Sequence, residues 1–172
     1  MNERDGYEDV FEGWLDEKGV KYVPVDQQKR KIFARNKIKS FDFIVYPRGG
    51  GQVIAEVKGR EFNGTSLAGM KNLECWVTLE DVKSLIQWEL VFEKGTRAVF
   101  VFVYKITGGD VDTDGAEIFE FFDEKYFFYT VLLDDYREFM KVRSPKWETV
   151  TLPASKFREF AVEGKDFFAS ED

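Results

Sequence analysis

The chain has 172 residues, of which 44% are hydrophobic and 33% charged, so its composition is that of a globular protein with a sizeable core. It contains no histidine, which excludes a histidine general base, a Ser-His-Asp triad and the usual zinc sites. The single cysteine, Cys75, excludes an internal disulfide framework and fits a reducing compartment. We find no apolar signal segment, and the longest apolar run, residues 98–104, is far shorter than the roughly 20 residues of a membrane helix. We therefore expect one cytoplasmic domain over residues 1–172, with no membrane contact.

The charge is unevenly distributed along the chain. The net charge is -7, yet residues 21–60 carry ten basic and three acidic side chains. A local basic segment indicates contact with a phosphate backbone better than whole-chain charge does. A solvated, lysine-rich loop at residues 27–39 explains the same excess, and both interpretations stay open.

The first element predicted is an amphipathic helix over residues 3–18, which ends at Gly19. Glu8 lies beside the apolar face of this helix, so we expect it to point along the core boundary toward the sheet. Glu12 follows one turn later and is expected to be solvated. Two short strands are predicted next, at residues 21–25 and 31–33.

A hairpin is predicted where two β-branched and aromatic runs, residues 41–46 and 53–57, flank a Pro-Gly-rich turn. A turn centred near Gly49 pairs positions so that Asp42 lies opposite Glu56. Directly opposed side chains on an antiparallel pair approach within about 5 Å at Cβ.

The hairpin gathers charged groups on one apolar face. Side chains alternate along a strand, so Glu56 and Lys58 share a face, which Asp42 joins across the ladder. Opposed carboxylates repel unless a cation lies between them, and a hard divalent ion suits such oxygen ligands. A solvated face with a simple Asp42–Lys58 ion pair is the alternative interpretation.

The rest of the chain alternates helices and strands around one very apolar segment. A capping box at Thr78–Asp81 opens a helix that is expected to run to about Lys94, with Gln87 beside its apolar face. The continuous apolar run at residues 98–106 predicts a central strand covered on both sides. The acidic turn at 107–115 lacks the downstream glutamate of a calcium-binding EF-hand loop. The apolar face of the helix that opens at Thr78 is expected to consist of Leu79, Val82, Leu85, Ile86, Leu90 and Val91. We further predict a loop at 61–76 and strands at 118–122, 126–133 and 147–152. Two more helices are predicted at 135–141 and 156–162, the second capped by Ser155.

The element order, with Asp42 on one strand and Glu56-Val57-Lys58 on the next, resembles the core of the PD-(D/E)xK nuclease superfamily. Thirteen residues separate Asp42 from Glu56. The resemblance implies an α/β, restriction-endonuclease-like fold with an αβββαβ core: a mixed central sheet flanked by helices, followed by extra C-terminal strands and helices.

A second resemblance covers only the N-terminal segment GYEDVFE, which is similar to the signature of an uncharacterised His-Tyr-Glu-x-Ala-Phe-Glu family. Tyr7, Glu8 and Phe11 match that signature, as does Glu12. Gly6 and Val10 depart from it. This family brings no established activity with it.

The nuclease resemblance implies roles for particular residues. Asp42 and Glu56 would hold Mg²⁺ or Mn²⁺, and Lys58 would position the attacking water or steady the phosphate. Glu8 would complete the metal site, with Glu12 as the second choice. Gln87 matches a glutamine that some branches carry on the following helix, although Val91 stands where those branches usually have tyrosine. No organic cofactor is implied.

The resemblance further implies a Mg²⁺-dependent phosphodiesterase that acts on DNA, as an endonuclease of repair, recombination or restriction type. Such proteins often form homodimers. The alternative is a non-catalytic nuclease-fold module that binds nucleic acid or a protein partner. The residues that we expect to contact phosphates are Lys37, Lys39, Arg48 and Arg60.

Overall fold

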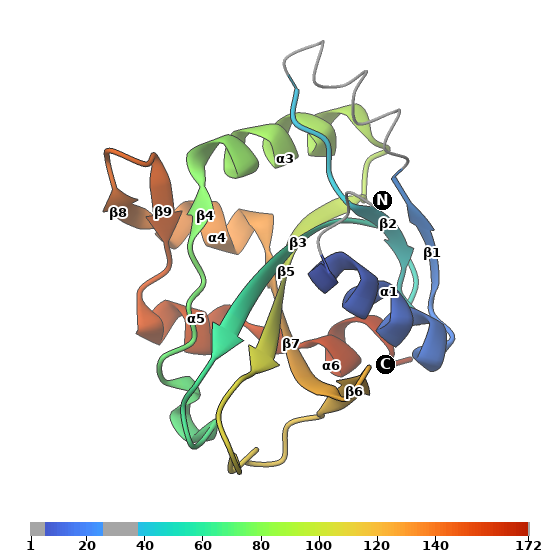
Figure 1. Ribbon diagram of the computed structural model, residues 1–172. Coiled ribbons are helices and arrows are strands. Elements are labelled where there is room, and N and C mark those ends of the chain that lie inside the picture. Colours follow the sequence, from blue (N-terminus) through green and yellow to red (C-terminus); the bar gives the residue numbers. More distant parts are fainter. Residues whose placement is uncertain (1–5, 26–37, 172) are drawn as a thin grey trace.

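The computed structural model describes residues 6–25 and 38–171. The predicted strand at residues 31–33 and the predicted phosphate contact Lys37 lie outside them. The described chain forms a mixed seven-stranded sheet in the order β1-β2-β3-β5-β7-β10, with β6 paired to β7, and a small sheet in the order β4-β9-β8 (Figure 1). The elements are α1 (Gly6–Lys18), β1 (Lys21–Pro24), β2 (Phe43–Tyr46), β3 (Val53–Phe62), β4 (Val77–Thr78), α3 (Leu79–Val91), β5 (Arg97–Ile106), β6 (Phe119–Phe121), β7 (Glu124–Leu132), α4 (Leu133–Phe139), β8 (Lys141–Ser144), β9 (Thr149–Thr151), α5 (Ala154–Phe160), β10 (Val162–Glu163) and α6 (Gly164–Phe168).

Strand β5 lies at the centre of the large sheet, parallel to β3 and antiparallel to β7. Its side chains alternate between two cores. Ala98, Phe100, Phe102 and Tyr104 belong to one buried cluster, and the intervening valines 99, 101 and 103 belong to the other. A strand that is covered on both faces needs no polar side, which explains the continuous apolar run. The prediction of a central strand is therefore confirmed.

Helices cover both faces of the large sheet (Figure 1). Phe11 and Trp14 of α1 pack with Phe168 of α6 in the core that contains the β5 valines. Leu85 of α3 and Phe157 of α5 belong to the opposite core, together with the β5 aromatic residues. The predicted order of helix, three strands, helix and strand is confirmed by α1, β1, β2, β3, α3 and β5. Within the described residues, no helix is long and apolar enough to cross a membrane.

The predicted hairpin register is also confirmed. Phe43 pairs with Ala55, so the next position outward places Asp42 opposite Glu56, and Asp42 N donates to Ala55 O at 3.0 Å. The turn uses Gly50 and Gly51 at positive φ, a conformation that glycine adopts without a steric penalty. The β2–β3 ladder ends at the Phe43–Ala55 pair, and β3 continues beyond it to Phe62.

Several boundaries differ from the predictions. Helix α3 ends at Val91, and its last residues Leu90 and Val91 are 82% and 68% exposed, so their assignment to the apolar face is wrong. Trp88 is buried instead. Helix α5 begins after Pro153 without a side-chain cap, so Ser155 does not cap it. The elements absent from the predictions are β4, β8, β10 and α6, which have two to five residues each and are too short to show a periodic pattern.

We expect Gly59→Ala to lower the free energy of unfolding by about 1–3 kcal/mol, because overpacking forces neighbours to move. A Cβ at Gly59 would lie 2.0 Å from the Tyr7 ring of α1. Thermal and chemical unfolding measure the effect. Gly109→Ala is the matched control, because nothing lies within 4 Å of its Cβ position. Equal stability of the two variants would contradict this packing of α1 on β3.

Candidate active site

Strand β3 places the charged row Glu56, Lys58 and Arg60 on the sheet face that α3 covers, because every second side chain of a strand points the same way. Glu56 is only 5% exposed. Lys58 Nζ lies 3.4 Å from Glu56 Oε2, and the Lys58 side chain is 17% exposed. The pair is thus largely desolvated, which strengthens each electrostatic contact that it makes.

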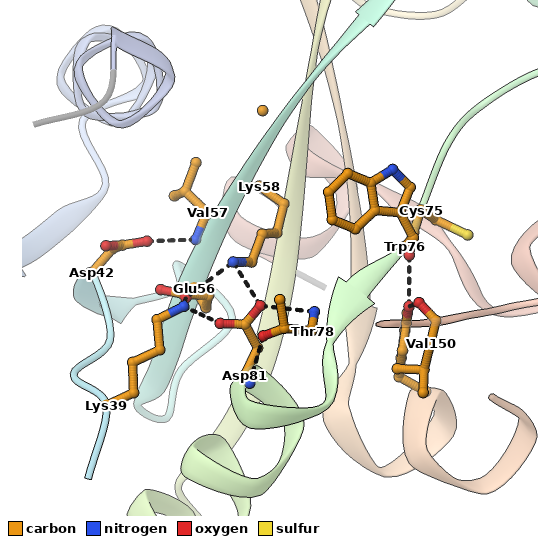
Figure 2. Close-up of polar contacts among 12 residues, drawn as sticks. Lys39, Asp42, Glu56, Val57, Lys58, Cys75, Trp76, Thr78, Asp81 and Val150 are labelled. Carbon is orange, nitrogen blue, oxygen red and sulfur yellow. Dashed lines mark hydrogen bonds and ion pairs between the residues drawn. The ribbon is translucent and has the colours of Figure 1, made fainter. Parts of the chain in front are cut away.

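Asp42 directly precedes β2, at the point where the pairing of β2 with β3 ends. Its carboxylate accepts a hydrogen bond that a paired strand would otherwise accept. Asp42 Oδ2 accepts a hydrogen bond from the backbone N–H of Val57 at 2.8 Å (Figure 2). This contact satisfies a β3 donor beyond the end of the β2 ladder and fixes the orientation of the carboxyl group. The Asp42 residue is 6% exposed. The sequence indicated the position of Asp42 but not this backbone contact.

A third carboxyl group, that of Glu8, reaches this pair from the first turn of α1. Burial raises the pKa of Asp42 well above its ordinary value, and the negative charges and hydrogen bonds of Glu56 and Glu8 raise it further. Glu8 is 8% exposed. The prediction that Glu8 points toward the sheet agrees with this contact. Three acidic groups at one buried point require a proton or a cation among them.

An aspartate that we did not select from the sequence completes the charge network. Asp81 of α3 lies between two lysines: its Oδ2 is 2.8 Å from Lys58 Nζ, and its Oδ1 contacts Lys39 Nζ (Figure 2). Lys39 Nζ also lies 3.3 Å from Glu56 Oε2. Glu56, Lys58, Asp81 and Lys39 therefore form a closed ring of alternating charges.

The pKa shifts of Asp81 and Lys39 favour the charged form of each side chain. Burial alone would raise the pKa of Asp81, but the positive charges of Lys58 and Lys39 outweigh it and hold that pKa below the ordinary value. Burial acts to lower the pKa of Lys39, yet the charges of Glu56 and Asp81 raise it above the ordinary value. Lys39, which we predicted to contact phosphate, thus lies inside the site.

The other predicted residues lie elsewhere. Gln87 is exposed on α3. Arg48 lies at the β2–β3 turn and donates to the backbone oxygen of Lys18, at the other end of α1 from Glu8. Glu12 accepts a hydrogen bond from the hydroxyl of Tyr22 at 3.0 Å.

A groove of about 870 Å³ lies along β3 beyond Lys58, and its lining includes none of the four ring residues. Tyr7, which precedes Glu8 on α1, and Gly59, which follows Lys58 on β3, line one part of it, and Trp76 and Arg143 line another. Arg60 donates to the backbone oxygens of Gly59 and Trp76, and its guanidinium lies 3.9 Å from the centre of the Trp76 ring. Burial lowers the pKa of Arg60. Arg143 lies over the same ring at 4.7 Å, so two guanidinium groups flank one indole at the groove wall.

The carboxylate oxygens of Asp42 and Glu56 suit Mg²⁺ better than a softer ion or an ion that needs protein ligands on all sides. In the described part of the chain, no group of three or more His, Cys, Asp and Glu side chains has an arrangement that would hold a metal ion. Magnesium, however, usually takes one or two carboxylates and keeps several waters. Burial and the neighbouring carboxyl groups of Glu56 and Glu8 together raise the pKa of Asp42, and this buried crowding of acids favours a cation beside Asp42 and Glu56.

Comparison with known proteins establishes the fold class. No family model and no curated protein matches the chain, so the resemblance of the N-terminal segment to the His-Tyr-Glu family stays a prediction. The structure is similar to that of Hjc from Archaeoglobus fulgidus, a Holliday junction resolvase from an archaeal hyperthermophile. The TM-score is 0.51 at 14% identity, over 94% of this chain and 91% of that chain. The fold is therefore the restriction-endonuclease-like nuclease fold, as predicted.

Proposed function

We propose that the protein is a divalent-metal-dependent nuclease that cleaves DNA. The observation that carries the proposal is the buried cross-strand pair Asp42–Glu56 with Lys58 beside it, on the fold of a nuclease. The site buries the carboxyl groups of Asp42, Glu56, Glu8 and Asp81 beside two lysines, Lys39 and Lys58. Because such an excess of buried acids costs folding free energy, a chemical role explains the cluster better than stability does.

In this proposal, each residue has a separate task. Asp42 and Glu56 would hold the metal ion, which when bound would supply an activated water molecule and neutralise charge at the scissile phosphate. The Val57 N–H keeps the Asp42 carboxylate in one orientation. Lys58 supplies a compact cation with three donors to a phosphate oxygen or to the attacking water. Glu8 adds a further acceptor from α1.

The groove beside the site suggests the path of the substrate. The guanidinium groups of Arg60 and Arg143 lie at the groove wall. There they can contact phosphates of the DNA strand on one side of the cleaved bond. Glu61 and Glu74 also line this groove, so its charge is mixed. Because the structural neighbour Hjc is a Holliday junction resolvase, branched DNA is the first substrate to test. A homodimer that cuts two strands belongs to the same proposal.

The alternative is a nuclease-fold module that binds nucleic acid or a protein without cleaving. Two observations favour it. Lys39 and Lys58 both already pair with Glu56, and the net charge of -7 opposes general DNA affinity. The alternative predicts binding that is independent of the metal ion.

The experiment is a cleavage screen over single-stranded, duplex and four-way-junction DNA and over RNA, with Mg²⁺, Mn²⁺ or a chelator. We expect metal-dependent cleavage of at least one DNA substrate, strongest on the junction. Binding without cleavage of any substrate would support the alternative. Cleavage that persists in excess chelator would contradict the metal site.

A further inference from the structure

Asp81 has two kinds of contact, and only one of them belongs to its helix. As the third residue of α3, its carboxylate accepts from Thr78 N at 3.0 Å, while Asp81 N donates to Thr78 Oγ1 at 3.0 Å. This reciprocal capping box begins the helix. The same carboxylate also contacts Lys39 and Lys58, which come from the chain before β2 and from β3.

The burial of Asp81 exceeds what capping requires. Its side chain is 0% exposed, whereas helix-capping acids at a protein surface remain solvated. A fully buried carboxylate is costly without cationic partners. The two lysines meet that need, and the capping box in turn fixes the carboxylate, because Thr78 N donates to it while the Thr78 hydroxyl accepts from Asp81 N.

The geometry points to Asp81 as a positioning residue: we propose that it holds Lys39 and Lys58 as a pair against Oε2 of Glu56. Both lysines lie near the same Glu56 oxygen, at 3.3 and 3.4 Å, although they come from different segments (Figure 2). Two ammonium groups that approach one carboxylate repel each other unless a second negative charge separates them. Asp81 provides that charge from the opposite side.

The inference deepens the proposed function, on which its catalytic consequence rests. The site then contains two lysines, so Lys39 is a second cation available to the phosphate or to the attacking water. The negative charge of Asp81 balances this second cation, so Lys39 does not cancel the negative charge that attracts a divalent ion to Asp42 and Glu56. The placement of the lysines themselves does not depend on nuclease activity.

The test compares four variants of the full chain. Asp81→Asn keeps an oxygen that can accept from Thr78 N but removes the charge, and Asp81→Glu keeps both the charge and a capping-box residue. Glu80→Gln, on the exposed side of the same first turn, is the charge-matched control. Thr78→Ala removes the hydroxyl that accepts from Asp81 N and leaves the lysine contacts of the Asp81 carboxylate in place.

The first measurement is the rate at which a small acylating reagent labels Lys58 and Lys39 at fixed pH, read by peptide mass spectrometry. We expect Asp81→Asn to raise both rates at least about fivefold, because the lysines lose their buried partner. The wild type, Asp81→Glu and Glu80→Gln should label slowly. Equal labelling of Asp81→Asn and wild type, or equal increases in Asp81→Asn and Thr78→Ala, would overturn the inference.

The second measurement is steady-state cleavage. We expect Asp81→Asn to lower kcat about tenfold or more with little change in KM, and Asp81→Glu to recover much of kcat. A pure capping role would leave kcat near the wild-type value at temperatures where the variant is folded, and this result would contradict the positioning role. If the wild type cleaves nothing, the proposed function fails, whereas the labelling rates still decide whether Asp81 places the lysines.

Discussion

Replacement of Lys58 by alanine is expected to lower the DNA-cleavage rate about 10²–10³-fold, the usual effect of removing one donor that stabilises a developing oxyanion. Lys58 Nζ lies 3.4 Å from Glu56 Oε2, and Lys58 directly precedes Gly59 and Arg60, which line the groove. The protein should stay folded, because Asp81 keeps its contact with Lys39 when Lys58 is lost. Single-turnover cleavage assays, with unfolding curves measured in parallel, test both statements.

Lys83→Ala is the matched control for this prediction, because Lys83 is exposed on α3 and carries the same charge. Cleavage by the control should equal that of the wild type. Cleavage that is equal in Lys58→Ala, Asp42→Ala and wild type would indicate a contaminating nuclease and remove the basis for the proposed function.

Replacement of Asp42 by asparagine is expected to abolish cleavage and yet to stabilise the metal-free protein by about 0.5–2 kcal/mol at neutral pH. The asparagine oxygen can still accept from Val57 N, and its amide can donate to Glu56 or Glu8. The variant thus removes one charge from a crowded acidic cluster. Excess Mg²⁺ should raise the unfolding temperature of the wild type more than that of the variant, because the ion binds the folded wild type through Asp42.

The pH dependence of this stability difference follows from the direction of the Asp42 pKa shift. The pKa in the folded state is raised, mainly by burial, so the folded protein binds the proton more tightly than the unfolded chain does. The stability of metal-free wild type should therefore fall as the pH rises from the ordinary aspartate pKa through the raised one. The Asp42→Asn variant should lack this fall, so that the two proteins are most similar in acid. A wild-type stability that rises over this range, relative to the variant, would contradict the burial of an unbalanced Asp42.

The fold and half of the site could be predicted because their determinants are local. The Pro-Gly turn sets the hairpin register, and that register alone brings Asp42 opposite Glu56. Alternation along β3 then places Lys58 on the face of Glu56. The uninterrupted apolar run of β5 identifies the central strand without any knowledge of its neighbours.

The rest of the site depends on contacts between distant segments. Asp81 belongs to an ordinary capping box, and nothing in its local sequence distinguishes a solvated cap from one that contacts Lys58 across the sheet face. The sequence predicts Lys39 only as a phosphate contact, because the path of the chain into β2 is not encoded by a pattern of residues. Gln87 was selected by resemblance, and the rotation of α3, which buries Trp88, leaves Gln87 exposed.

The most direct test of the metal site is anomalous scattering from crystals of the protein that contain Mn²⁺. We predict a peak bound by the carboxylates of Asp42 and Glu56, with the Lys58 ammonium group alongside and Asp81 still in contact with the lysines. A structure at saturating Mn²⁺ with no peak at these carboxylates, and with Lys39 and Lys58 unmoved on Glu56, would contradict it.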